Sequence, residues 1–409
     1  MNLIIKLAWR NIWRNKRRSL LTLAAISFAA FASIAMRGIQ YGTYKLNIEN
    51  AVNLFSGYIQ VQQPEYQENP TLNKSIGNVQ LLERKLSSIA LVKGYSPRIY
   101  ADGLISFNEN SFGVAIFGIS PSKEKTVTQI TNKIKEGRFF SSDTENVIVV
   151  GYKLLENLKA NIGESVVLLA QGADGSMGNL KFKIIGTIKT GSLDFDVMGV
   201  FIGLNKADEL LAMCGKVNVI AVKLKSLDYL NEAKDEINNK LAGTNLKVLS
   251  WDEIMPELNE SIEFDNIGGI LYLAILVIIV VFGILNTILM SITERFKEFG
   301  ITLAIGMPQN KIVLLVFIET VFIAVIGLIA GNIIGFGINL YIIHNPIEFS
   351  GTAVQLYEQY GFLPKMESSL LPLIFINTSI IIFIAAIISS LYPLYKVYKL
   401  EPLKGIRYT

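Results

Sequence analysis

Four stretches of the sequence are apolar over enough residues to cross a lipid bilayer, and they limit the fold more than any other feature. They are residues 19–37, 267–292, 312–343 and 369–393. A transmembrane helix needs about 20 consecutive, mostly apolar residues, and each stretch approaches or exceeds that length. Of the 409 residues, 51% are hydrophobic and 18% are charged, which is too apolar for an ordinary soluble domain. The sequence therefore predicts an integral membrane protein with four transmembrane helices.

The first apolar stretch follows a basic segment, residues 1–18, which a secretory signal peptide could also show. This segment is amphipathic, with Leu7, Trp9 and Trp13 able to lie at the membrane interface. No clear small-residue cleavage site precedes the polar sequence that begins at Arg37. We therefore predict a cytoplasmic amphipathic helix over residues 1–18, followed by an uncleaved first transmembrane helix.

The distribution of basic residues predicts which side of the membrane each segment faces, because cytoplasmic loops carry an excess of Lys and Arg. Three segments are rich in these residues: 1–18, 293–311 and 394–409. The loop between the third and fourth stretches, residues 344–368, carries only Lys365. Both termini and the 394–409 tail are therefore expected in the cytoplasm, and residues 38–266 outside. That outer region also contains many lysines, but the rule weakens for long loops.

The region of about 230 residues between the first two stretches is long enough for one or two folded subdomains. The predicted strands are 57–63, 147–150, 165–170, 182–188, 200–203 and 219–224, and the predicted helices are 79–88, 152–158, 206–213 and 227–242. The order strand, helix, strand from 219 to 249 predicts a small β-α-β unit, with a second unit of strands, residues 143–203, inserted in it. We predict a large α+β extracytoplasmic domain over residues 38–266.

Catalytic and metal-binding motifs are scarce in this chain. The chain has one cysteine, Cys214, and one histidine, His344. These are too few for an intrachain disulfide or a Cys/His zinc site, and they make a His-based triad improbable. We expect a buried, unreactive thiol and a loop imidazole. Asp194 and Asp196 are the nearest approach to a carboxylate pair, but no nucleophile or base accompanies them, so we expect an exposed loop. The sequence predicts neither an enzyme nor a metal site.

Two further features have simple interpretations. The glycines of residues 171–179 lack the Gly-Lys-Ser/Thr that follows in a phosphate loop, and they predict the tip of a hairpin. The net charge of +4 is spread along the chain, so it gives no sign of a nucleic-acid partner.

Polar and small residues inside the apolar stretches are candidate packing sites. One stripe of small residues in the third stretch comprises Gly327, Gly331 and Gly335. Such a stripe lets another helix approach closely, and both a dimer seam and packing within the subunit fit it. Glu319 lies about two turns inside the same stretch, where we expect a structural pair with Arg or Lys rather than a proton relay. Asn286 and Asn332 are candidates for hydrogen bonds across helices.

A short charged segment lies directly between the second and third stretches. It contains Glu294, Arg295, Lys297 and Glu298, and Gly306-Met307-Pro308 ends any helix there. Glu294 and Glu298 are one turn apart and would share a face of a helix. A solvated loop that anchors the topology and an element that a cytoplasmic partner pushes both fit these residues.

Three stretches of the sequence resemble the FtsX-like, MacB-type (type VII) ABC transporter permeases, and most closely their lipoprotein-releasing, LolC/LolE-like subgroup. They are residues 7–26, 284–308 and 392–408. In the second, the family pattern E-R-x-x-E-x-G-x-x-x-A-x-G falls on Glu294, Arg295, Glu298, Gly300, Ala304 and Gly306. The resemblance implies that residues 293–311 form a cytoplasmic coupling helix and loop, with the helix over Glu294 to Gly306, including Lys297, in contact with an ATPase. The order of one span, a large outer domain and three spans also resembles the family.

The resemblance implies a permease subunit of a bacterial inner membrane whose outer domain moves when a cytoplasmic ABC ATPase dimer closes on ATP. The sequence contains no G-x-x-x-x-G-K-S/T, so ATP is expected to bind to a separate subunit. Further implied partners are a second copy or a paralogue, membrane lipid, and a lipoprotein cargo or a periplasmic protein. Lipoprotein release is the leading interpretation. The alternatives are an FtsX-like transducer that regulates a cell-wall hydrolase, and MacB-like efflux of peptides or drugs.

Overall fold

The computed structural model of the chain describes residues 2–400, except 15, 193, 353, 355–356 and 358–362. Residues 401–409 of the predicted tail, and with them most of the motif at its end, lie outside the described residues. The chain divides into two compact units. The helical unit contains the chain up to Tyr44, Ile262–Glu348 and the chain from Lys365 onward, and the outer unit contains Lys45–Ser261 and Phe349–Pro364.

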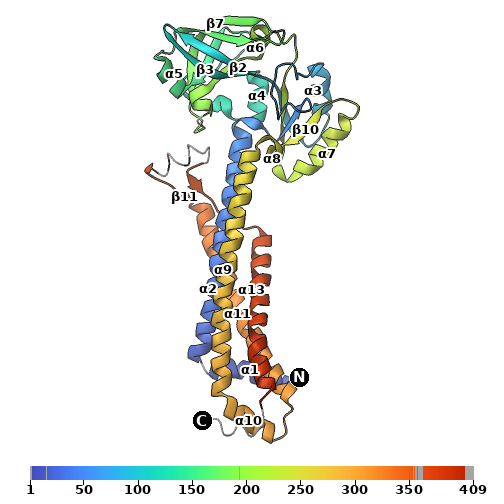
Figure 1. The fold of residues 1–409 in the computed structure, drawn as a ribbon, viewed down its shortest axis with the longest axis vertical. Coiled ribbons are helices and arrows are strands. Elements are labelled where there is room, and N and C mark those ends of the chain that lie inside the picture. The colour runs from blue at the N-terminus through green and yellow to red at the C-terminus, as the bar shows by residue number, and fades with distance from the viewer. Residues whose placement is uncertain are drawn as a thin grey trace. The chain divides into compact units, whose positions relative to one another are not determined.

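Four helices among the described residues are long and apolar enough to cross a membrane (Figure 1). They are α2 (Lys16–Ala51), α9 (Pro256–Glu294), α11 (Gln309–His344) and α13 (Pro372–Tyr398). Each contains nearly all of one predicted apolar stretch and extends beyond it at one end or both. The extensions follow from helix geometry, because a helix pairs its own backbone groups and can continue into polar sequence where a membrane span ends.

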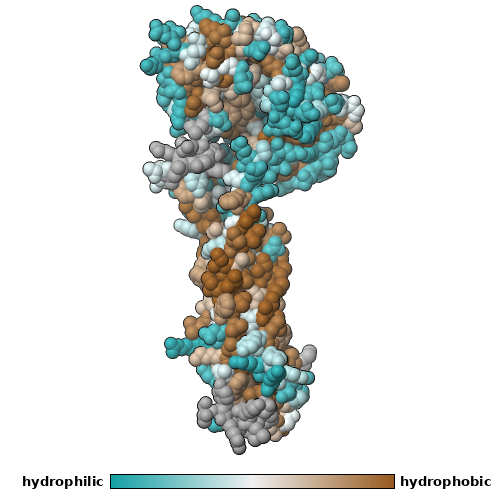
Figure 2. Space-filling view, viewed as in Figure 1, coloured by the Kyte–Doolittle hydropathy of each residue, from teal (hydrophilic) through white to brown (hydrophobic). Residues whose placement is uncertain are grey.

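The centre of the helical unit is built from small and branched side chains. The buried cluster comprises Ile26, Ala29 and Ala30 of α2, Val280 and Ile284 of α9, Ala324 and Leu328 of α11, and Ile382 and Ala386 of α13. Large apolar side chains such as Phe282 and Ile333 point outward instead. On the face shown in Figure 2, apolar residues cover the middle of this bundle. An apolar exterior of this kind suits helices surrounded by lipid.

Two shorter helices complete the helical unit. In α1 (Asn2–Arg14), Ala8 and Ile12 are buried while Trp9 and Trp13 are half-exposed, as its amphipathic sequence predicts. The segment between α9 and α11 forms α10 (Phe296–Ala304), which is shorter than the predicted coupling helix.

The prediction that Glu294 and Glu298 share one helix face is wrong. Glu294 is the last residue of α9, and a turn at Arg295 separates it from α10. Gly306 follows α10 with φ +101°, in the left-handed region that glycine adopts easily, and this ends the segment.

The outer unit is built on one ten-stranded mixed sheet, in the order β10-β1-β9-β2-β3-β8-β5-β7-β4, with β6 paired to β2 and β7. Its strands are β1 (Ile59–Gln62), β2 (Val92–Phe107), β3 (Asn110–Ile119), β4 (Ile134–Gly137), β5 (Val147–Gly151), β6 (Ser165–Gln171), β7 (Met177–Ile188), β8 (Gly199–Gly203), β9 (Val219–Leu224) and β10 (Lys247–Ser250). The pairs β3–β8 and β5–β7 are parallel and the others are antiparallel. Two short strands of the helical unit, β11 (Ile347–Glu348) and β12 (Lys365–Met366), pair separately.

The long hairpin of β2 and β3 is absent from the sequence prediction. Pro97, Gly103 and Gly113 interrupt its pattern and favour turns locally. In the structure, however, β2 pairs with β9, β3 and β6 along its length, and this pairing outweighs the local preference. As a result, the two predicted groups of strands share one sheet instead of forming separate units. The glycine-rich segment joins β6 to β7 as a hairpin tip, as predicted.

Short helices cover this sheet (Figure 1). They are α3 (Val79–Ser87), α4 (Pro121–Val127), α5 (Tyr152–Leu158), α6 (Leu204–Leu211), α7 (Leu230–Lys240) and α8 (Trp251–Ile254), with the π-helical turns η1 (Val52–Ser56) and η3 (Asp194–Met198). The predicted β-α-β unit is present as β9, α7 and β10, and β1 lies between its two strands. One buried cluster of the unit includes Phe55, Ile119, Phe140 and Phe201.

Candidate functional site

Two helix junctions of the helical unit are joined by ion pairs. Arg14, at the end of α1, pairs with Glu298 of α10, and Arg18 of α2 pairs with Glu294 of α9. The two arginines are four residues apart and so are the two glutamates, so both pairs can form at once. Pairs with this much exposure contribute only about 0–1 kcal/mol each to stability. Their main effect is to fix the α1–α2 junction against the α9–α10 junction.

A buried ion pair lies beside these junctions. Nη1 of Arg295 donates to both carboxylate oxygens of Glu319 on α11, at 3.1 and 2.8 Å, and the two side chains are 10% and 12% exposed. Asn11 of α1 donates through Nδ2 to the same carboxylate at 2.6 Å, and the Arg295 guanidinium lies 4.8 Å from the ring centre of Phe299. Glu319 thus has the arginine partner that a charge in an apolar helix requires. The pair connects the α9–α10 turn to α11 and α1.

A cavity of about 60 Å³ adjoins these ion pairs, enclosed by α1, α2, α9 and α11. Its polar lining includes Arg14, Arg18, Arg295 and Glu319, together with the hydroxyl residues Ser19, Thr22, Thr287, Ser291 and Thr320. A space of this size and polarity can hold a few water molecules. Such water molecules can hydrogen-bond to the charged groups of Arg18, Arg295 and Glu319 that line the cavity.

The outward face of α10 and the turn after it is mostly apolar. Lys297, Ile301 and Ile305 follow one another at four-residue spacing and share a face, and Ala304 is exposed beside them. Ile301 is 46% exposed and Ile305 is 83% exposed. Lys297 has no ion-pair partner among the described residues. The opposite face, with Phe299 and Gly300, is buried against the bundle. We call Lys297, Ile301, Ala304 and Ile305 the outer stripe of α10.

Sequence reasoning assigned four charges of this segment to contacts with a partner, but the structure pairs three of them within the chain. Glu294, Arg295 and Glu298 all form ion pairs with other helices of the bundle, whereas Lys297 forms none within the part of the chain that the structure describes. The signal in the sequence was the matching spacing of Arg14 and Arg18 with the two glutamates, but spacing alone does not identify which distant segment supplies a partner.

The glycine stripe of α11 packs against α2 of the same chain. A Cβ atom placed on Gly331 would lie 2.5 Å from the Cβ of Ala30, and one on Gly327 or Gly335 would lie 2.8 Å from Ile26 or Ile34. Ser27 donates to the carbonyl oxygen of Gly327 at 3.0 Å. Of the two interpretations left open by the sequence, packing within the subunit is the one that the structure shows, because α2 already fills this face.

The two asparagine candidates differ in their surroundings. Asn332 donates through Nδ2 to Oγ of Ser379 on α13 at 2.9 Å, so it forms a hydrogen bond across helices. Asn286 is exposed and has no hydrogen-bond partner among the described residues.

Hydrogen bonds also join α2 to α9 far from the α9–α10 junction. Gln40 donates through Nε2 to Asp265 at 2.7 Å (backbone oxygen) and 2.9 Å (carboxylate), and Tyr44 donates to that carboxylate at 2.6 Å. Gly269 allows this close approach, since a Cβ there would lie 2.3 Å from the Gln40 side chain. The boundary between the two units falls within α2 and within α9. These helices therefore carry the chain from one unit to the other.

A joint of irregular backbone follows α2 in the outer unit. The helix passes into η1, and Gly57 after it has φ +78°. The Gly57 N–H donates to the carbonyl of Val52 at 3.0 Å, and Gln60 donates through Nε2 to the carbonyl of Ser56 at 2.7 Å. These bonds satisfy the backbone where the helix ends and β1 begins.

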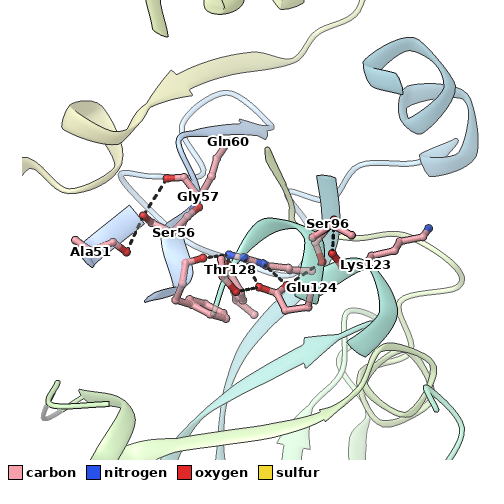
Figure 3. A network of polar contacts seen from close by, with 12 residues as sticks. Ala51, Ser56, Gly57, Gln60, Ser96, Lys123, Glu124 and Thr128 are labelled. Carbon is pink, nitrogen blue, oxygen red and sulfur yellow. Dashed lines mark hydrogen bonds and ion pairs between the residues drawn. The ribbon is translucent and has the colours of Figure 1, made fainter. Parts of the chain in front are cut away.

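Arg98 of β2 holds this joint from within the outer unit. Its fully buried guanidinium donates to the carbonyl of Phe55 in η1 and pairs with Glu124 of α4 at 2.7 and 3.0 Å. Ser96 and Thr128 donate to the same carboxylate (Figure 3). No pattern in the sequence pointed to this network, because β2 itself was not predicted.

Three expectations for the remaining residues are corrected. Asp196 is buried rather than exposed, because its carboxylate accepts hydrogen bonds from Thr190 and from the N–H of Gly191. Cys214 is exposed rather than buried. His344 is the last residue of α11 rather than part of a loop. Among the described residues, no three His, Cys, Asp or Glu side chains gather as a metal site would require.

Comparisons with known proteins match both units. The family model of the MacB-like periplasmic core domain matches residues 19–240, and that of the FtsX-like permease C-terminal matches residues 270–402. An uncharacterized ABC transporter permease of Methanocaldococcus jannaschii is 23% identical over 99% of this chain and 97% of its own. The lipoprotein-releasing system transmembrane protein LolC of Xylella fastidiosa is 22% identical over 78% of each chain. The macrolide export ATP-binding/permease protein MacB of Bdellovibrio bacteriovorus is 24% identical over 96% of this chain, which spans 60% of that relative's length.

Proposed function

The chain belongs to the ABC transporter permeases with a MacB-like periplasmic core domain and an FtsX-like C-terminal region, and we propose that it works by mechanotransmission. In this proposal a separate cytoplasmic ATPase dimer binds and hydrolyses ATP, and its closure pushes α10. The movement passes along the helices to the outer domain. In this proposal the permease itself catalyses no reaction and needs no cofactor, because ATP is bound by the separate subunit.

The observation that carries this proposal is the bracing of α10 against the other helices. Two ion pairs connect the α9–α10 junction to α1 and α2, and the Arg295–Glu319 pair connects it to α11. A helix with an intact backbone ladder is stiff along its axis. A force on α10 would therefore displace α2 and α9, which lead into the outer unit, instead of being absorbed by a loose loop.

The proposed contact with the ATPase is the outer stripe of α10. Exposed isoleucines on a short helix outside the apolar spans suit an apolar groove on a partner, and Lys297 beside them can pair with a carboxylate there. This changes the roles of the predicted coupling residues. Glu294, Arg295 and Glu298 position α10 within the permease, while Gly300 allows its packing and Gly306 ends the segment.

For the cargo, we propose lipoprotein released from a bacterial inner membrane, with both termini of the permease in the cytoplasm and a second copy or a paralogue completing the complex. The support is the likeness to LolC, which covers 78% of this chain. The proposal predicts that depletion of the protein leaves outer-membrane lipoproteins in the inner membrane. Normal lipoprotein localisation after depletion would favour a transducer for a cell-wall hydrolase or an efflux role instead.

The coupling proposal is tested at the outer stripe. Replacing Ile301 and Ile305 with Asp should abolish co-purification of the ATPase, because two charges would enter the apolar contact. The matched control is Met177→Asp, which changes an equally exposed apolar residue of the outer unit. Retention of the ATPase by the double variant, at the level of the control, would contradict the proposed contact.

A further inference from the structure

The outer unit contains a cavity of about 920 Å³ that the coupling mechanism does not use. Its lining comes from the end of α2, η1, β1, the loop after β1, strands β2 and β3, the β6–β7 hairpin tip and η3. Ligand sites in proteins commonly have volumes of about 300–1,000 Å³. The chemistry of the lining indicates which ligand it fits.

Aromatic rings form one wall of this cavity. Phe55, Tyr100, Phe117 and Phe195 all line it and pack against one another. The ring centres of Phe55 and Phe117 are 4.9 Å apart, and those of Phe117 and Phe195 are 5.2 Å apart. All but Phe55 are partly exposed. The faces of such rings bind apolar groups and also attract cations.

The charged groups of the lining are all acidic. Among the described residues that line the cavity, Asp102 and Asp194 are charged, and none is Lys or Arg. Arg98 lies behind the aromatic wall, but its charge is balanced by Glu124. Burial raises the pKa of the Tyr66 hydroxyl, and the nearby charges of Tyr100 and Asp102 act in the same direction. Tyr66 therefore remains an uncharged hydroxyl group, and the cavity presents two carboxylates to a ligand.

Amide side chains line a different part of the cavity. Gln60 and Gln62 of β1 and Gln67 after it are joined by hydrogen bonds from Nε2 of Gln62, at 2.7 Å to Gln60 and 3.4 Å to Gln67. Gln60 and Gln62 are buried, whereas Gln67 is exposed. The amide of Gln67 can accept a hydrogen bond from a polypeptide backbone N–H and donate one to a backbone carbonyl.

From these features together we infer that the cavity binds an extended polypeptide segment with a Lys or Arg side chain beside apolar ones. The basic group lies between the aromatic rings and the carboxylates of Asp102 and Asp194. Gln67, which is exposed, binds the backbone of the segment. The volume exceeds what a single ammonium group needs, which favours a polypeptide over a small cation. The inference rests on the proposed function only in taking the cargo or outer partner of the permease to be a polypeptide.

The test uses the purified full-length chain in phosphatidylcholine nanodiscs, without ATP and without an ATPase. The probe is a fluorescent synthetic nonapeptide, three repeats of Ala-Lys-Phe, and its comparison peptide has Glu in place of Lys. Fluorescence anisotropy should show the Lys peptide binding at least about tenfold more tightly, and empty nanodiscs correct for lipid binding. Asp102→Asn with Asp194→Asn should weaken its binding about tenfold. Both residues are exposed, so this variant should fold normally.

The matched control is Asp235→Asn, which removes an exposed carboxylate on α7 that does not line the cavity, and it should leave binding unchanged. Equal binding of the two peptides, or binding unaffected by the Asp102 and Asp194 changes, would overturn the inference. So would full displacement of the Lys peptide by an equal concentration of tetraphenylphosphonium, since that would identify a small-cation site. No ATPase is present in this assay, so a negative result does not contradict the coupling proposal. Retention of the ATPase by the outer-stripe variant, which would contradict the coupling proposal, likewise does not contradict the binding of a polypeptide in the cavity.

Discussion

At the scale of single residues, charge is used in two ways in this protein. Pairs such as Arg14–Glu298 are half-exposed, so they contribute little to the free energy of unfolding. Their main effect is to position the helices that they join. The Arg295–Glu319 pair is buried, so each charge depends on the other to offset the cost of leaving water. Loss of one partner therefore has very different consequences in the two cases.

The first prediction concerns the buried pair. Glu319→Gln should lower the free energy of unfolding by about 1–3 kcal/mol, because the buried Arg295 guanidinium loses its closest carboxylate and keeps only the half-exposed Glu298, at 3.7 Å. Thermal unfolding of the detergent-purified protein measures this. Glu49→Gln is the control, since the Lys45–Glu49 pair is exposed with a nitrogen–oxygen distance of 3.9 Å, and its loss should change the free energy by less than about 0.5 kcal/mol. Equal melting of the two variants would show that the buried pair does not hold the bundle.

At the scale of elements, the α9–α10 junction is positioned by ion pairs and α11 by close packing. Both can be tested by variants that differ in one contact. For the ion pairs, Glu298→Lys should reduce permease-stimulated ATP hydrolysis about two- to fivefold, because the new positive charge repels Arg14, its closest partner, and also faces Arg295. Arg14→Glu in the same chain should restore the rate by re-forming the pair with reversed charges. If Glu298 instead touches the ATPase directly, the double variant will be no better than the single one.

The packing of α11 against α2 gives a second test at this scale. Gly331→Ala should destabilise the protein by about 1–3 kcal/mol, because the new methyl group overlaps Ala30 and the carbonyl of Ser27. Gly337→Ala on the same helix meets nothing within 4 Å, so it should be neutral or stabilising by up to about 1 kcal/mol through helix propensity. The comparison is a pair of thermal melts. An unchanged melting temperature for Gly331→Ala would mean that α2 and α11 do not pack closely there.

At the scale of the whole molecule, two helices link the units. Helices α2 and α9 are joined to each other near Gln40 and Asp265, and again at their other ends by the Arg18–Glu294 pair, while the Arg14–Glu298 pair joins α1 to α10. Removing these two ion pairs should therefore separate ATPase binding from the response of the outer domain, because the outer stripe would remain while the connection of the α9–α10 junction to α1 and α2 is lost.

This separation can be measured because Cys214 is the single cysteine, is exposed and lies in the outer unit. A fluorescent probe attached there should change its signal when ATP is added to the complex with the ATPase. In the variant with Arg14→Gln and Arg18→Gln, the ATPase should still co-purify but the change should fall by at least about half, since each lost pair carries part of the connection. A full signal change in this variant would rule out the ion pairs as the route of coupling.

The sequence by itself determined the four apolar helices, the position of the outer domain along the chain, most of its shorter strands and the charged segment between the second and third apolar helices. Long apolar runs have few alternatives in a membrane, where every backbone group must be paired within the protein. A short motif such as Glu294 to Gly306 is likewise contained in neighbouring residues. These features are local, so they could be predicted without knowledge of the fold.

Only the tertiary structure decided which groups meet. From the sequence, Glu294 and Glu298 could equally pair with Arg18 and Arg14 or contact a partner protein. The glycine stripe that contains Gly331 could equally pack against α2 or against a second subunit. The β2–β3 hairpin, the Arg98–Glu124 pair and the acidic aromatic cavity all join residues far apart in sequence. Burial and pairing between distant segments stabilise these features. The neighbouring residues in the sequence do not indicate which distant segment each one contacts.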